Sequence, residues 1–170
     1  MFAKPWRALL ALWLALILVA PAGAAAAEEP IELRSGTATV TVDGATQTAP
    51  VELSYHWDRK HQGRPGSASF DLPFTLGAAP ETPWGIFIPR AGSVLEVSLN
   101  DALLQVYGDL GRANGPDYAK APIYVPVPGH LLKAGDNHLQ IRIRADGARR
   151  AGLSRVTIGP ATPVRTDLFE

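Results

Sequence analysis

The sequence predicts an all-β chain, folded as a jelly-roll β-sandwich of eight or nine mostly antiparallel strands. Apolar and polar residues alternate with a period of two over most of its length, as in strands that bury one face. Fifteen prolines and sixteen glycines suit many tight connections. Turn signals recur at the spacing typical of sandwiches. Helical periodicity is scarce, and only one short helical turn is expected, at residues 128–132.

The strands follow one another with short turns between them. The first, Thr37–Val42, is rich in β-branched residues and ends at the turn pair Asp43-Gly44. Pro73 indicates an edge strand or a bulge, because proline has no N–H to donate to a ladder. Asn100-Asp101 is a good hairpin turn. The remaining strands are expected at 51–55, 70–74, 86–88, 95–99, 103–107, 123–127, 139–143 and 153–158.

The first 27 residues have the order of parts found in a cleavable secretory signal peptide. Lys4 and Arg7 precede an uncharged apolar run at 8–20, and an alanine-rich stretch ends at Ala27. The run is shorter than the roughly 20 residues of a spanning helix, so an uncleaved anchor is the weaker alternative. We therefore expect a periplasmic protein with a signal peptide at 1–27, a flexible segment at 28–36, the β-sandwich at 37–160 and a tail or truncated linker at 161–170.

The composition excludes several classes of function. Without the signal, 14 Lys and Arg face 16 Asp and Glu, a net charge of −2, which gives no general attraction to nucleic acid. The chain has no cysteine, so disulfides and thiol chemistry are excluded. His56, Asp58 and His61 are of metal-ligating types, but a strand-to-loop region fixes no geometry for them. We expect no metal, no cofactor and no nucleic-acid partner.

Two longer stretches resemble known families. The sequence VSLNDALLQVYGDL, followed by APIYVPVPGHLLKAGDNHLQIRI, resembles the galactose-binding-like jelly roll, a sugar-binding module found beside many glycosidases. In it, Leu131 and Leu132 would close one end of the sandwich. Gly135 would permit a left-handed turn, and the side chain of Asn137 would hold that turn.

A second resemblance covers roughly Val51 to Pro160. VELSYHWDRKHQGRPGSASFDLPFTL, PWGIFIPRAG and RRAGLSRVTIGP are similar to the periplasmic N-terminal domains of proteobacterial membrane sensors, of the seven-transmembrane type. Those sensors continue through transmembrane helices to a histidine kinase or a diguanylate cyclase. This chain ends at Glu170, so we expect a truncated product, the sensor part alone, or a free-standing relative.

Two long connections, His56 to Gly66 and Gly108 to Ala121, are the candidate binding regions. Polar side chains beside an aromatic ring are what a carbohydrate site needs. Trp57 could stack on a sugar or could belong to the core, and a solvated loop would look much like a site. The predicted ligand-binding residues are Trp57, Tyr107, Asp109, Arg112, Asn114, Asp117, Tyr118 and Lys120.

Arg142 and Arg144 share one outward strand face and form a predicted interaction surface. They could pair with acids on a neighbouring strand, such as Glu96, or contact another domain, an envelope protein or lipid headgroups. A solvated, partly paired face is the simpler alternative.

No G-x-S-x-G, H-E-x-x-H or Walker motif is present in the sequence, so no enzymatic activity is expected of this chain. The leading hypothesis is an extracytoplasmic ligand-sensing or binding domain of a signal-transduction protein. The alternatives are a free-standing carbohydrate-binding module and a structural or interaction protein of the envelope. The expected partners are a small molecule or carbohydrate, and a membrane signalling module or an envelope protein.

Overall fold

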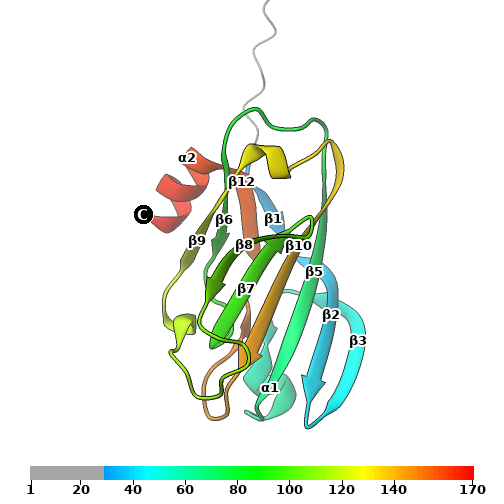
Figure 1. The fold of residues 1–170 in the computed structure, drawn as a ribbon, viewed down its shortest axis with the longest axis vertical. Helices are drawn as coiled ribbons and strands as arrows, with labels where there is room; N and C mark the ends of the chain where they lie inside the picture. The colour runs from blue at the N-terminus through cyan, green and yellow to red at the C-terminus, as the bar shows by residue number, and fades with distance from the viewer. Residues whose placement is uncertain (1–28) are drawn as a thin grey trace, which may run out of the picture.

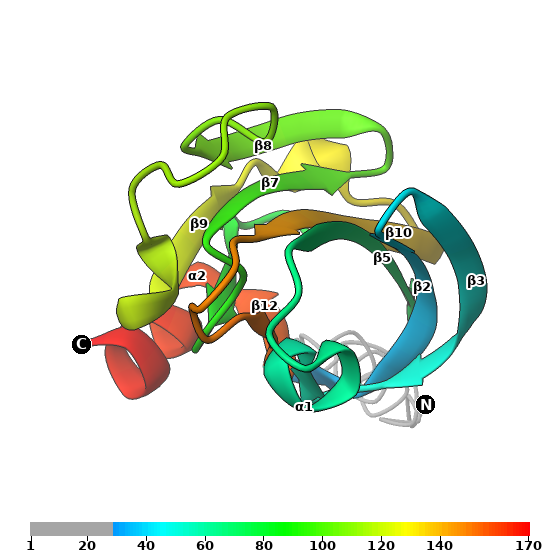
Figure 2. The ribbon, with the colours of Figure 1, turned by 90° about the horizontal axis from the view of Figure 1, so that it is seen from below.

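The computed structural model describes residues 29–170. The predicted signal peptide lies outside the described residues. Two antiparallel sheets form the expected β-sandwich (Figure 1). Seen along its length, the larger sheet curves over the smaller one, and the two enclose the core (Figure 2). Among residues 29–170, no helix combines the length and the apolar character needed to cross a bilayer.

The larger sheet has six strands in the order β3-β2-β5-β10-β7-β8. Its central strand β10 pairs with β5 along its whole length and with β7 over its second half. Every second residue of β10 from Asn137 onward is buried, as the alternating sequence predicts. The strands are β2 (Ser35–Val42), β3 (Ala45–Glu52), β5 (Gly66–Leu76), β7 (Val94–Leu99), β8 (Ala102–Tyr107) and β10 (Gly135–Ala145).

The smaller sheet has four strands in the order β1-β12-β6-β9. A two-stranded pair, β4 with β11, lies at the end of the sandwich that carries the helix α1. The smaller elements are β1 (Ile31–Leu33), β4 (Tyr55–His56), α1 (Trp57–His61), β6 (Trp84–Ile88), β9 (Ile123–Val127), β11 (Gly152–Leu153) and β12 (Val156–Pro160).

Short helical turns complete the chain. The turn η1 (Tyr118–Lys120) precedes β9, and η2 (Gly129–Leu131) lies where the sequence predicts a turn. At the C-terminus, α2 (Ala161–Pro163) and η3 (Val164–Phe169) form one helical segment. The fully buried Val164 anchors this segment, and the Phe169 ring lies 5.8 Å from that of Tyr124.

Both chain ends differ from the expectation. Residues 28–36 are predicted to be flexible, yet Ile31–Leu33 pairs with β12 as β1, and Leu33 is buried. The predicted tail at 161–170 is largely helical and packs against β6. In both places a few apolar side chains find room at the edge of the core, which a short segment does not reveal by periodicity.

Two strand predictions also need correction. The alternation at 51–55 is not one strand, because β3 ends at Glu52 and β4 begins at Tyr55. Strand β3 starts instead at Ala45, directly after the Asp43-Gly44 turn. Pro73 does not lie in an edge strand, since β5 pairs on both sides. The ladder between β5 and β2 ends at Asp71, however, so Pro73 needs no partner on that side.

One end of the sandwich is closed by a buried side-chain network. The Asn137 Oδ1 atom accepts hydrogen bonds from Asn100 Nδ2 (2.8 Å) and Lys133 N (3.1 Å). Its Nδ2 atom donates to the carbonyl oxygens of Lys133 (2.8 Å) and Gly135 (3.0 Å). Leu132 is buried beside this network. Gly135 has a positive φ of 83°, so the turn expected of Gly135 and Asn137 is confirmed. Of the leucine pair, Leu132 is buried and Leu131 is partly buried against the core.

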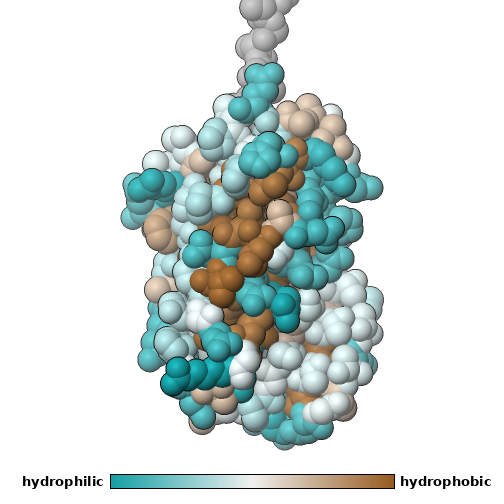
Figure 3. Space-filling model, viewed as in Figure 1, coloured by the Kyte–Doolittle hydropathy of each residue, from teal (hydrophilic) through white to brown (hydrophobic). Residues whose placement is uncertain are grey.

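One face of the molecule carries a band of apolar surface. Figure 3 shows a band of apolar side chains over the face that carries β7 and β8. On β8, Leu103 and Val106 are 60% and 42% exposed. Strand β8 is an edge strand of the larger sheet.

Candidate ligand-binding site

The long loop between β8 and β9 uses three of its six predicted binding residues for contacts within its own structure. Asp109 Oδ1 accepts a hydrogen bond from Gly111 N (2.8 Å), and Asp117 Oδ1 accepts one from Ala119 N (3.1 Å). The ring of Tyr118 packs 5.6 Å from that of Tyr107. These contacts are those of an ordered loop.

The other predicted residues of this loop are exposed. Arg112 and Asn114 face solvent, and Asn114 has a positive φ of 57°. Lys120 Nζ lies 3.9 Å from Asp117 Oδ2. Asp117 and Lys120 line a shallow cleft of about 370 Å³ together with Arg90. The loop residues therefore do not gather around one cavity.

Trp57 belongs to the core, the alternative that the sequence left open. It is 1% exposed, and its Nε1 atom donates a hydrogen bond to the Arg64 carbonyl oxygen (2.7 Å). It therefore cannot stack on a ligand. Its burial fastens the short helix α1 to the sandwich and so positions the residues that follow it.

The predicted arginine surface is largely paired within the molecule. Arg142 Nη1 lies 2.8 Å from Glu96 Oε2, directly across the β10–β7 ladder, which is the pairing considered from the sequence. Arg144 donates to Asp146 Oδ1 and to the Leu110 carbonyl oxygen, both at 3.0 Å. Arg149 also lies near Asp146 and donates to the Gly115 carbonyl oxygen (2.8 Å). Arg144 and Arg149 thus hold the β8–β9 loop.

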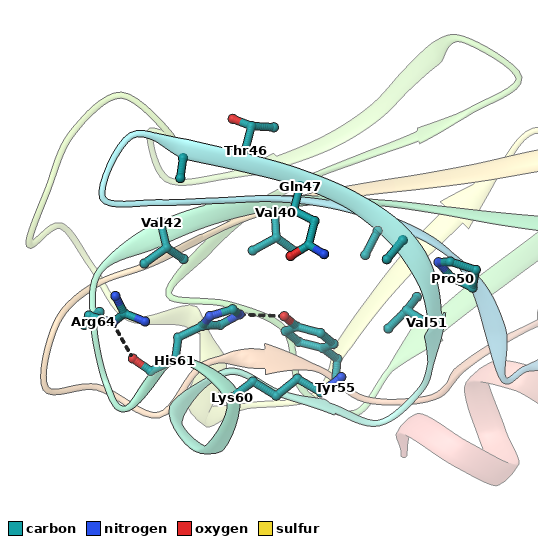
Figure 4. Close-up of a pocket in the computed structure, with 13 residues that line it drawn as sticks. Val40, Val42, Thr46, Gln47, Pro50, Val51, Tyr55, Lys60, His61 and Arg64 are labelled. Carbon is teal, nitrogen blue, oxygen red and sulfur yellow. Dashed lines mark hydrogen bonds between the residues drawn. The ribbon is translucent and has the colours of Figure 1, made fainter.

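A cleft lies under the curved ribbon of β2 and β3, and none of the eight predicted binding residues lines it. We call it the ribbon cleft; its volume is about 550 Å³ (Figure 4). The ribbon forms one wall, and Tyr55, Lys60, His61 and Arg64 form the other.

Strand alternation explains the apolar wall. Val40 and Val42 of β2 point into the cleft, and Gln47 of β3 points in from the opposite strand (Figure 4). Ala38 of β2 also lines the cleft. The residues between them point outward, where Thr39 and Thr48 hydroxyls lie 2.9 Å apart. The ribbon is therefore apolar inside and polar outside, as a period-two pattern requires.

The polar wall is built on α1. The Tyr55 hydroxyl lies 2.6 Å from His61 Nε2, and Lys60 Nζ lies 4.5 Å from the centre of the Tyr55 ring. Burial raises the pKa of Tyr55. Burial, with the nearby charges of Arg64 and Lys60, lowers the pKa of His61 below 6.5. At neutral pH the pair is uncharged, and Lys60 and Arg64 supply the positive charge.

Arg64 marks the mouth of the ribbon cleft. Its Nη1 atom lies 2.7 Å from Asp43 Oδ2 in the β2–β3 turn, and its Nε atom donates to the His61 carbonyl oxygen (3.2 Å). This ion pair ties the ribbon to the segment after α1. No Asp or Glu is among the residues that line the cleft, so it lacks the two facing carboxylates of most glycosidases.

The histidines and Asp58 do not converge on a metal. Asp58 Oδ1 accepts a hydrogen bond from Ala151 N (2.9 Å), while His61 faces Tyr55. Within residues 29–170, no three side chains of metal-ligating type come together.

The ribbon cleft was not predicted from the sequence, because residues 45–50 were not recognised as part of strand β3. The alternation of Thr46, Gln47 and Thr48 after the Asp43-Gly44 turn was the available signal.

No protein-family model matches this chain, and no curated protein matches it. Several solved structures are similar in fold. The FMN-binding β-glucuronidase from Facaelibacterium prausnitzii L2-6 aligns over 77% of this chain and 22% of its own, with 16% identity and a TM-score of 0.59. The GH2 β-galacturonidase from Eisenbergiella tayi, bound to galacturonate, aligns over 78% and 24%, with 12% identity and a TM-score of 0.57.

The β-glucuronidase from Ruminococcus gnavus is similar to the same degree, with 11% identity, a TM-score of 0.59 and 78% of this chain covered. The chain spans less than a third of the length of each of these enzymes. At such identities the likeness concerns the fold and not the activity. The chain therefore shares a β-sandwich fold with part of each of these glycosidases.

Proposed function

We propose that this chain is an exported, non-catalytic carbohydrate-binding domain, and that the ribbon cleft is its binding site. The observation that carries the proposal is the composition of that cleft. It joins an apolar wall to hydrogen-bonding side chains in a volume of about 550 Å³, which is within the range of small-molecule sites. A sugar ring has the matching chemistry, with apolar C–H faces and a polar edge of hydroxyl groups.

The residues have distinct roles in this proposal. Val40 and Val42 pack against the C–H face of the ring, and Gln47 hydrogen-bonds a hydroxyl from the ribbon side. The His61–Tyr55 pair, uncharged at neutral pH, accepts from and donates to further hydroxyls. The similar solved structures are named for glucuronides and galacturonides. A uronate in the ribbon cleft would place its carboxylate beside Lys60 and Arg64.

A titration of the chain against a panel of neutral and acidic monosaccharides and short oligosaccharides tests the proposal. Gln47→Trp fills the cleft from the inner face of β3 and is expected to abolish binding. Thr48→Trp adds the same bulk to the outer face and is expected to leave binding intact. Circular dichroism would verify that both variants fold. No binding across the panel, or equal binding by the two variants, would contradict the proposal.

A sensory role is the second candidate, favoured by the packing of the C-terminal helical segment. Val164 is fully buried against the sandwich, so a change in the sandwich would reach residues 161–169 directly. Hydrogen exchange of this segment with and without saturating sugar would test the role. Altered exchange supports a sensor, and unchanged exchange supports a binding module that does not signal through this segment.

A further inference from the structure

A second cleft lies on the other side of α1 and is lined by three arginines that come from distant parts of the sequence. Arg59 belongs to α1, Arg90 follows β6, and Arg150 precedes β11. We call this site the arginine cleft; its volume is about 450 Å³. Arg90 and Arg150 also line the neighbouring cleft of about 370 Å³ that contains Lys120 and Arg149. The two clefts therefore adjoin each other at Arg90 and Arg150, and both are lined by cations.

Backbone hydrogen bonds hold the base of the arginine cleft. Trp57 N donates to the Ala151 carbonyl oxygen (3.1 Å), which joins α1 to the segment that carries Arg150. Ser154 N donates to the Arg90 carbonyl oxygen, and Arg90 N donates to Ser154 Oγ, both at 3.0 Å. The three arginine Cα positions are thus fixed relative to one another, while the side chains remain exposed.

The charges in the arginine cleft are not balanced within the described chain. Seven of the eleven arginines in residues 29–170 lie within 4.0 Å of a carboxylate. The four others in that range are Arg59, Arg90, Arg112 and Arg150, and three of these share the arginine cleft. Its only lining acid is Asp58, which already accepts a hydrogen bond from Ala151 N.

Gathering three guanidinium groups without counter-charges opposes folding through their mutual repulsion, and a bound anion would relieve this repulsion. Guanidinium groups bind carboxylates through two parallel hydrogen bonds, so each arginine can hold one acidic group. Two clefts that share Arg90 and Arg150, with five cations among their lining residues, match a chain with several carboxylates better than a single ion. We propose that the arginine cleft binds an acidic polysaccharide through its uronate carboxylates.

The surroundings of the cleft favour a polysaccharide over other polyanions. Tyr55 is the only aromatic residue, histidine apart, among those that line the two clefts, and it is 6% exposed. Nucleic-acid bases would therefore find no ring on which to stack. The exposed large apolar side chains of the described chain lie on β8 and in the C-terminal helical segment. The cleft thus offers no apolar side chain to insert into a lipid surface.

A titration with a short oligogalacturonate tests this inference, with a neutral cello-oligosaccharide of equal length as the reference ligand. The triple variant Arg59→Gln, Arg90→Gln and Arg150→Gln is expected to lose at least about tenfold in affinity, because it removes three charge-assisted contacts. The matched control, Arg34→Gln, Arg155→Gln and Arg165→Gln, changes the net charge equally and is expected to stay within about twofold. Added salt is expected to weaken binding by the unaltered chain.

Three outcomes would overturn the inference. These are an equal loss in both triple variants, equal binding of the neutral oligosaccharide, and binding of anionic phospholipid vesicles or inorganic phosphate without binding of oligogalacturonate. The variant Gln47→Trp separates this site from the ribbon cleft. It is expected to retain oligogalacturonate binding at the arginine cleft even if the ribbon cleft binds no sugar.

Discussion

At one end of the sandwich, the side chains of Asn100 and Asn137 are hydrogen-bonded to each other and to the backbone. At the end that carries α1, three arginines line one cleft and have no carboxylate partner among residues 29–170: Arg59, Arg90 and Arg150. The buried Asn137 side chain makes four hydrogen bonds. The three arginines have no carboxylate within 4.0 Å among residues 29–170. The first arrangement stabilises the fold, and the second is left available to a ligand. The two ends can therefore be separated experimentally.

The largest expected effect is at the closed end. Asn137→Ala removes the side-chain partner of Lys133 N and of the Lys133 and Gly135 carbonyl oxygens, and it leaves Asn100 Nδ2 with the Leu131 carbonyl oxygen as its acceptor. We expect it to lower the free energy of unfolding by about 2–4 kcal/mol, since each orphaned buried group carries a desolvation cost. Urea unfolding measures the loss. The neighbouring exposed variant Asp136→Ala should cost less than about 1 kcal/mol, and similar losses in both would contradict the role of the network.

A smaller loss is expected where α1 is fastened to the sandwich. Trp57→Phe keeps an aromatic ring in the core but removes the hydrogen bond to the Arg64 carbonyl oxygen. We expect a decrease of about 1–2 kcal/mol in the free energy of unfolding. Sugar binding by the folded variant should remain, because Trp57 is buried. If the variant folds but no longer binds sugar, Trp57 would again be a candidate for direct contact with the ligand.

The arginine cleft should respond in the opposite direction. The triple variant at Arg59, Arg90 and Arg150 removes repulsion and no ion pair. We expect its free energy of unfolding to be unchanged or to rise by up to about 1 kcal/mol. Thermal unfolding at low salt is the most sensitive measurement. A clear decrease in the free energy of unfolding would show that these arginines stabilise the fold. It would then contradict the contrast between a stabilising network at one end and unpaired charges at the other.

The smallest effect is a pH dependence from the ribbon cleft. Burial, and then the charges of Arg64 and Lys60, lower the pKa of His61 in the folded state. As the pH falls below about 6.5, the unfolded chain therefore binds the proton first, and stability decreases until the pH lies below the folded pKa. Urea titrations from neutral to mildly acidic pH should show this decrease. His61→Gln should reduce it, and an unchanged pH dependence in this variant would contradict the role of His61.

The sequence predicted the end closed by the Asn137 network better than the end that carries the arginine cleft, because the signals at the closed end are local. Gly135 and Asn137 lie within one turn, and the Asn100-Asp101 turn has the positive φ values that its residue types favour. The alternation of apolar and polar residues in β10 can likewise be recognised without knowing which strands lie beside it. These features depend on residues close together in the chain, and so they are visible in its order.

The arrangement of residues at the end that carries the arginine cleft depends on how distant elements pack together, which the order of residues in the chain does not reveal. Arg59, Arg90 and Arg150 meet only because α1, the end of β6 and the start of β11 pack together. Strand β3 was partly missed because its residues 45–50 include no large apolar side chain. The sequence left the position of Trp57 open for a similar reason. Its burial depends on Gly66 at the start of β5 and on the carbonyl oxygen of Arg64, two residues earlier.

The absence of cysteine from this chain gives the Asn137 network an added consequence. In many small exported domains a disulfide joins loops that are distant in sequence, and its formation depends on an oxidising compartment. Here the Asn137 amide group joins the β7–β8 turn to the loop before β10 as a crosslink made only of hydrogen bonds. Such a crosslink needs no oxidant or isomerase and re-forms whenever the chain refolds. Thiol reductants therefore do not weaken this crosslink.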